Sequence, residues 1–177
     1  NRGANVDHAN AIGDTVLLGA SEKGHLDTVL LLVDREAAVD HANNDGGTAL
    51  IWASQEGHFE IVTALIDAGG DVNRASKKRN APLICAVRNG HHKPVIAQLE
   101  ANVNATDKSC EIPLILAIQN GNRETVTALL KAGADVNQRM KGNTPLIVAS
   151  GKPLLIIWVF VINYGANFGK AIKMGSR

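Results

Sequence analysis

The chain has 177 residues, of which 45% are apolar, 20% charged and 3% aromatic, and its net charge is +1. This is a foldable composition, and the near-zero net charge argues against nucleic-acid binding driven by overall charge. The only two cysteines, Cys85 and Cys110, lack close spacing, which excludes a disulfide framework and favours reduced thiols.

The chain starts with a polar stretch, 1–10, that is unlike a signal peptide. Residues 1–7 end in "NVD", and this ending returns as "AVD" at 38–40, "DVN" at 71–73, "NVN" at 102–104 and "DVN" at 135–137. We therefore expect 1–7 to be the tail of a preceding unit in a longer parent protein.

A second set of positions repeats with the same period. Spacings of 33, 33, 31 and 32 residues separate Thr15, Thr48, Ala81, Ile112 and Thr144. A fixed period of this length indicates a repeat architecture. We predict five units at about 8–40, 41–73, 74–104, 105–137 and 138–169, with 170–177 as a tail or the start of another unit.

The residue pattern of each unit predicts two short helices. A Thr hydroxyl can cap the first helix, and Pro in its first position costs no hydrogen bond. A small residue allows close packing, and it recurs as Ala20, Ala53, Ala86, Ala117 and Ala149. Glycine then ends the first helix at Gly24, Gly57, Gly90 and Gly121, and an apolar stripe follows, as in "EIVTALI". Helices this short need neighbours for stability.

The motifs "TVLLGA", "TALIWA", "APLICA", "IPLILA" and "TPLIVA" resemble the T-P-L-H-x-A signature of ankyrin repeats. The resemblance covers nearly the whole chain and implies an all-α solenoid of stacked helix–turn–helix units with β-turn fingertips. The signature His is replaced in every unit, by Leu18, Ile51, Ile84, Ile115 and Ile147. "GDTVLLGA" and "TALIWAS" resemble, more narrowly, the ankyrin domains of neuronal scaffolds that interact with protein kinase D.

Two units are irregular. The third is two residues short between Leu99 and Val103 and has Pro94 in its second helix, which is harmless only within the first turn. We expect this unit to be the weakest interior interface. In the fifth, Pro153 stands where other units have Gly, and Leu154 to Ile162 is apolar on every face. That run is covered by further repeats or another domain, or it is a docking or dimer surface; it is too short to span a membrane.

The sequence suggests no catalytic residue, no metal site and no cofactor. It lacks G-x-S-x-G and the phosphate loop G-x-x-x-x-G-K-[ST]. His25, His58 and His91 share one repeat position, which favours a structural role over metal binding. Cys85 lies in a predicted helix, and Cys110 replaces a turn glycine.

The ankyrin resemblance implies that ligands contact the fingertips and the exposed end of each first helix. Carried over unit by unit, the candidate partner-binding residues are Asp14, Glu22, Lys23, Asn44, Asp45, Gln55, Glu56, Lys77, Lys78, Arg79, Asn80, Arg88, Lys108, Glu111, Gln119, Lys141 and Asn143.

Charge is unevenly distributed along this surface. Between Val72 and Leu99 there are six basic residues and no acidic one, whereas the first two units are acidic at the equivalent places. A bipolar groove would orient a partner of mixed charge, although solvated loop charges without a partner explain the pattern too. Trp52 is either an apolar anchor for a ligand or a packing residue between units.

We therefore predict a non-catalytic cytoplasmic or nuclear module that binds a protein or an extended peptide through its groove and fingertips. The alternatives are a regulatory or targeting domain of a larger enzyme, channel or host-directed effector, and an anionic-lipid or phosphate surface at 77–79. No nucleic-acid partner and no membrane span are expected, and self-association or intramolecular docking would use 154–162.

Overall fold

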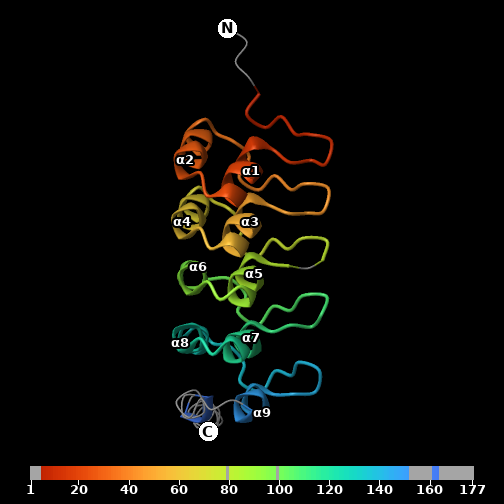
Figure 1. Cartoon of the computed structure of the whole chain (residues 1–177), viewed down its shortest axis with the longest axis vertical. Helices are drawn as coiled ribbons and strands as arrows, with labels where there is room; N and C mark the ends of the chain where they lie inside the picture. Colours follow the sequence, from red (N-terminus) through yellow and green to blue (C-terminus); the bar gives the residue numbers. More distant parts are fainter. Residues whose placement is uncertain (1–4, 79, 99, 152–160, 164–177) are drawn as a thin grey trace, which may run out of the picture.

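The computed structural model describes residues 5–78, 80–98, 100–151 and 161–163. Within these ranges the helices form two parallel rows (Figure 1). The inner row contains α1 (Val16–Lys23), α3 (Ala49–Glu56), α5 (Pro82–Arg88), α7 (Pro113–Asn120) and α9 (Pro145–Ser150). The outer row contains α2 (Leu26–Asp34), α4 (Phe59–Asp67), α6 (His92–Ala97) and α8 (Arg123–Lys131).

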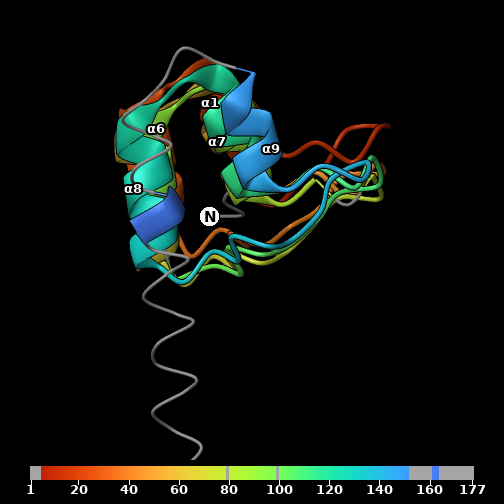
Figure 2. The same cartoon turned by 90° about the horizontal axis from the view of Figure 1, so that it is seen from below.

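Loops precede each inner helix and project together to one side of the stack (Figure 2). We call them fingertips one to five, at 10–14, 43–47, 76–80, 107–111 and 140–143. The stack has the all-α architecture that the repeat predicts, and the one β-bridge among the described residues joins Met140 to Asn143 in fingertip five.

The inner helices begin in two ways. Thr15, Thr48 and Thr144 cap theirs, and each Oγ1 accepts a hydrogen bond from the backbone N–H three residues later at 3.3–3.4 Å. Ala81 and Ile112 have no capping oxygen, and Pro follows each of them at the start of the helix. Because Pro has no N–H to leave unpaired, the lost cap costs less there.

Glycine is required at the ends of α1 and α3 for two reasons, its backbone conformation and its lack of a side chain. Gly24 and Gly57 have φ of +77° and +83°, where other residues are strained. A Cβ on Gly24 would lie 2.6 Å from the ring of His58, whose Nε2 donates to the carbonyl oxygen of Glu22 at 3.1 Å. His91 makes the same two contacts in the next helix pair. Its ring would meet a Cβ on Gly57, and its Nε2 donates to the Gln55 carbonyl oxygen at 3.0 Å. The repeated histidines therefore join successive helix pairs.

A second polar ladder follows the turns after the outer helices. The last residue of four of the five "VD" or "VN" endings accepts a hydrogen bond from a backbone N–H of the next unit. The pairs are Asp7 with Ala38 at 2.9 Å, Asp40 with Asp71 at 2.9 Å, Asn73 with Asn102 at 2.7 Å, and Asn104 with Asp135 at 2.8 Å. The recurring endings are thus contacts between neighbouring units.

Apolar side chains replace the signature His without leaving a polar gap. At four of the five positions the side chain is at most 4% exposed: Leu18, Ile51, Ile84 and Ile115. Apolar packing there replaces the polar side chain of the signature. Ile147 differs, at 52% exposed.

The buried apolar residues form two clusters, one over α1 to α4 and the other over α5 to α9. A buried polar contact lies where the two meet. Gln98, at the position held by Leu65 and Leu129 in the neighbouring pairs, donates from Nε2 to Ser54 Oγ at 2.6 Å. Its Oε1 is buried without a hydrogen-bond partner, which costs stability at this junction.

The third pair also has the shortest outer helix of the four that are described, six residues against nine. Pro94 is its third residue, in the first turn, where no intrahelical N–H bond is lost. The proline is therefore harmless, and the buried glutamine is the clearer source of weakness.

Much of the apolar run at 154–162 lies outside the described residues, as does Pro153. Of its last two residues, Val161 is buried and Ile162 is 45% exposed. No helix among the described residues is long and apolar enough to cross a membrane.

We expect Gln98→Leu to raise the free energy of unfolding by about 1–3 kcal/mol, because it removes an unpaired buried oxygen. The Ser54 hydroxyl keeps its own bond to the Leu50 carbonyl, at 2.6 Å. The denaturation midpoint measures the change, and amide exchange should be faster in α6 than in α4 or α8.

The matched control is Leu65→Gln, the reverse change at the equivalent position, which should destabilise. A lower midpoint for Gln98→Leu, or uniform exchange protection of the three helices, would contradict a weak third interface.

Candidate partner-binding site

The fingertips are held in shape by side-chain oxygens near their starts. Asn10 Oδ1 accepts from the backbone of Ile12 and Asp14, and Asn43 and Asp107 repeat the arrangement at 2.8–3.1 Å. Ser76 Oγ accepts from the Asn80 N–H at 3.3 Å in fingertip three. Because each turn is closed by its own side chain, the residues at its tip have fixed positions.

Neighbouring fingertips are also bonded to one another. The backbone N–H groups of Asn44, Lys77 and Lys108 donate to carbonyl oxygens of the preceding fingertip, those of Ile12, Asp45 and Lys78, at 3.0, 2.9 and 3.3 Å. The tips of four successive loops therefore form one continuous edge.

A hollow of about 420 Å³ lies between this edge and α3. We call it the fingertip hollow, and its lining is Asp45, Gly47, Ile51, Trp52, Gln55, Ser76, Lys77, Lys78, Asn80 and Lys108. Six of these, Asp45, Gln55, Lys77, Lys78, Asn80 and Lys108, are candidate binding residues from the sequence. The fold brings together residues from three units.

Trp52 forms part of the lining and also packs against the cluster of α1 to α4. A Cβ on Gly47 would lie 3.0 Å from the indole Nε1, so glycine there leaves room for the ring. The indole N–H donates to no described residue and is not a buried unpaired atom. The packing role of Trp52 is thus confirmed, whereas its role as a ligand anchor stays a prediction that its place in the lining allows.

Arg88 ends α5, at the end of the first helix as the sequence predicts, and it also joins two units. Its Nη2 is 2.6 Å from Asp107 Oδ2, and its Nε is 2.9 Å from Glu111 Oε2. The Asp107 side chain is only 4% exposed. One indirect signal of this ion pair is present in the sequence: Asp107 has a carboxylate where Asn10 and Asn43 have an amide.

Of the four acidic candidates in the first two units, Asp45 lines the fingertip hollow and the other three do not. Asp14 accepts from Asn43 Nδ2 at 2.8 Å, Glu22 pairs with Lys23 at 3.4 Å, and Glu56 accepts from Gln55 Nε2 at 3.0 Å.

Four further candidates, Asn44, Gln119, Lys141 and Asn143, are exposed but do not line the fingertip hollow. Arg79 lies outside the described residues.

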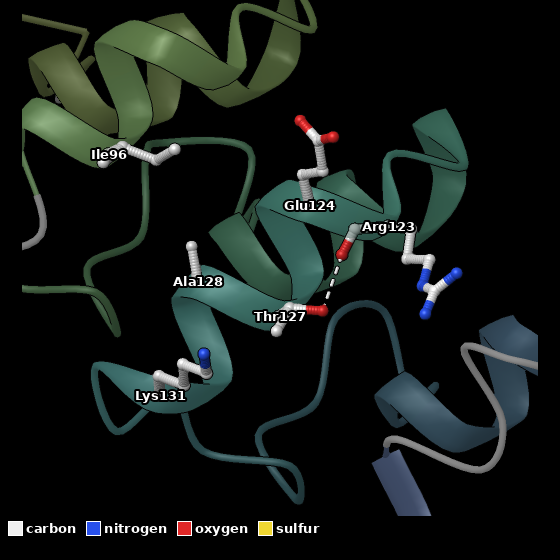
Figure 3. Close-up of a pocket in the computed structure, with 6 residues that line it drawn as sticks. All are labelled: Ile96, Arg123, Glu124, Thr127, Ala128 and Lys131. Atoms are coloured by element: carbon white, nitrogen blue, oxygen red, sulfur yellow. Dashed lines mark hydrogen bonds between the residues drawn. The ribbon is translucent and has the colours of Figure 1, made fainter.

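A second hollow, of about 510 Å³, lies on the outer row beside the short α6 (Figure 3). Ile96 contributes from α6, and the rest comes from α8: Arg123, Glu124, Thr127, Ala128 and Lys131. Ile96 is 50% exposed, where α4 and α8 have Thr63 and Thr127. None of these residues is a candidate from the sequence.

The family described as ankyrin repeats (3 copies) matches residues 2–76 and 83–171. The chain belongs to the ankyrin-repeat family. A search of the curated proteins finds no match, and the narrower resemblance to kinase-D-interacting scaffolds has no support. Ankyrin repeats are generally protein–protein interaction modules and are typically non-catalytic, and their stacked units present an extended concave surface.

Arg88→Met should lower the free energy of unfolding by about 1–3 kcal/mol, between the values typical of exposed and buried ion pairs, because the Asp107 carboxylate stays buried without its cation. Chemical denaturation measures the change. Lys23→Met, which breaks the exposed pair with Glu22, is the control and should change stability little. Equal effects of the two substitutions would contradict a structural role for Arg88.

The ionisation of Cys85 should make stability depend on pH. Burial raises the pKa of Cys85 from its ordinary 9.0 to about 11; the nearby Arg88 lowers it and Asp107 raises it. The folded state therefore holds this proton more tightly than the unfolded state. The resulting stabilisation is complete below pH 9.0 and is lost as the pH rises through about 11, by about 2–3 kcal/mol in total.

We expect Cys110→Ser to lose more stability over this pH range than Cys85→Ala/Cys110→Ser, as measured by denaturation at each pH. The exposed Cys110 is removed from both proteins so that it does not contribute. Parallel pH profiles would show that Cys85 does not contribute.

Proposed function

We propose that this chain is a non-catalytic interaction module that holds an extended peptide or loop of a partner protein in the fingertip hollow and along the adjoining inner helices. The observation that carries the proposal is the hollow itself, which joins six sequence-predicted residues from three units. A ligand there would contact several units at once and would be specific to their order in the stack.

The rigidity of the edge supports this function. Fingertips two, three and four are joined by backbone hydrogen bonds at 2.9 and 3.3 Å and closed by their own side chains. A surface that is already ordered loses little conformational entropy on binding, so more of the contact energy appears as affinity.

Trp52 supplies the apolar anchor that rim charges cannot replace. Interfaces owe most of their affinity to a few central residues, with Trp among the commonest, whereas exposed ion pairs add little. In the fingertip hollow, Trp52 is surrounded by Gln55, Asn80 and three lysines, which is an apolar centre with a polar rim.

Selection of displayed random peptides on the intact chain tests the proposal. We expect the selected peptides to bind Trp52→Ala at least about 2 kcal/mol more weakly, as for a central anchor. Gln55→Ala/Asn80→Ala should weaken them too, and it leaves the core intact if Trp52→Ala proves unstable. Titration calorimetry measures the affinities.

Ile96→Ala, in the outer hollow, is the matched control and should leave binding unchanged. Peptides that lose affinity for Ile96→Ala but not for the variants of the fingertip hollow would place the site on the outer row and refute the proposal.

A further inference from the structure

We propose that the fingertip hollow recognises an acidic segment, an extended stretch of Asp or Glu residues with an apolar side chain that contacts Trp52. This inference rests on the proposed function and specifies the chemistry of the partner.

The first argument is an excess of positive charge in the lining. Lys77, Lys78 and Lys108 are exposed, and none makes an ion pair with a described residue. The only carboxylate in the lining is that of Asp45. The bond from Lys108 N–H to the Lys78 carbonyl keeps the two lysine backbones adjacent, at 3.3 Å.

The second argument is that the carboxylates of fingertip four are already occupied. Asp107 and Glu111 belong to the same fingertip as Lys108, and both are bound by Arg88, at 2.6 and 2.9 Å. The two Asp107 oxygens have different partners. Oδ2 accepts from Arg88, and Oδ1 accepts from two backbone N–H groups. Arg88 thus binds both acids and offsets one of their two charges, and neither acid forms an ion pair with Lys108.

The third argument is the preponderance of hydrogen-bond donors. Besides the three ammonium groups, the lining includes Trp52, whose indole N–H has no hydrogen-bond partner among the described residues. Ammonium and indole groups have no acceptor to offer, so the best ligand supplies acceptors and negative charge. Carboxylates do both.

The type of cation favours carboxylates over the other anions. Phosphorylated motifs are typically held by arginine clusters, which grip phosphate in a bidentate way, whereas lysine acts as a point charge. Anionic membranes are typically bound by four to eight clustered basic residues, whereas the described part of the lining has three lysines in a concave site. Three lysines around a tryptophan suit a short acidic peptide.

The experiment extends the peptide selection to charge. Peptides that depend on Trp52 should carry excess Asp and Glu, and their Asn and Gln isosteres should bind at least about tenfold more weakly. The acidic peptides should also lose affinity between about 0.01 M and about 0.1 M salt, where the Debye length falls from about 30 to about 10 Å. The isosteres should show no such loss.

Lys77→Gln/Lys78→Gln/Lys108→Gln should abolish the preference for acidic peptides. The matched control is Lys23→Gln/Lys131→Gln/Lys141→Gln, which removes the same charge from exposed lysines outside the fingertip hollow and should preserve it. Thermal unfolding checks that both variants fold.

Three outcomes would overturn the inference. Trp52-dependent peptides without an acidic preference would refute it and leave the proposed function standing, whereas a complete lack of peptides dependent on the fingertip hollow would refute both. Tenfold tighter binding of a phosphoserine peptide than of its Glu counterpart would assign the lysines to phosphate. Lysine-dependent sedimentation with phosphatidylserine vesicles, without binding of acidic peptides, would assign them to a lipid surface.

Discussion

The structure depends on one constraint: no helix pair has a core of its own. Each inner helix has six to eight residues, too few to be stable alone. Its apolar side chains are buried against the pairs before and after it, as for Leu50, Ile84 and Ile115. Stability is therefore a sum over neighbouring interfaces, and one poor interface weakens the stack locally. The same constraint produces the open shape, because stacking extends the molecule without closing its surface.

Polar contacts give this apolar stack its register. The histidines that donate to the previous pair, the Asp and Asn ladder after the outer helices, and the bonds between fingertips each recur with the period of the repeat. Hydrophobic burial is not directional, whereas these bonds require particular atoms at particular distances. They turn the loop tips into an ordered edge, which an interaction surface requires.

The third pair combines a buried unpaired oxygen with the strongest concentration of positive charge. Gln98 replaces a leucine, and its buried oxygen has no partner. Two lysines of the fingertip hollow belong to the same unit, and Arg88 of that unit binds the acids of the next fingertip. Binding across fingertips two to four would connect the two apolar clusters on either side of this junction. A ligand there would stabilise the stack at the place where it is weakest.

The sequence by itself determined what one unit needs: the Thr caps, the Pro starts, the Gly24 and Gly57 ends, the apolar stripes and the family. Each of these features depends on residues that are close together in the chain. Their recurrence with a period of about 33 residues makes them recognisable in the sequence. Only the tertiary structure decided which side chains meet across units. Arg88 reaches Asp107, 19 residues away, and Gln98 reaches Ser54, 44 residues away. Sequence spacing does not encode such distances, because they arise from the stacking geometry. For that reason the sequence places Arg88 at the end of its helix, whereas only the fold shows that it binds two carboxylates of the next fingertip and that Asp45 lines the hollow with three lysines.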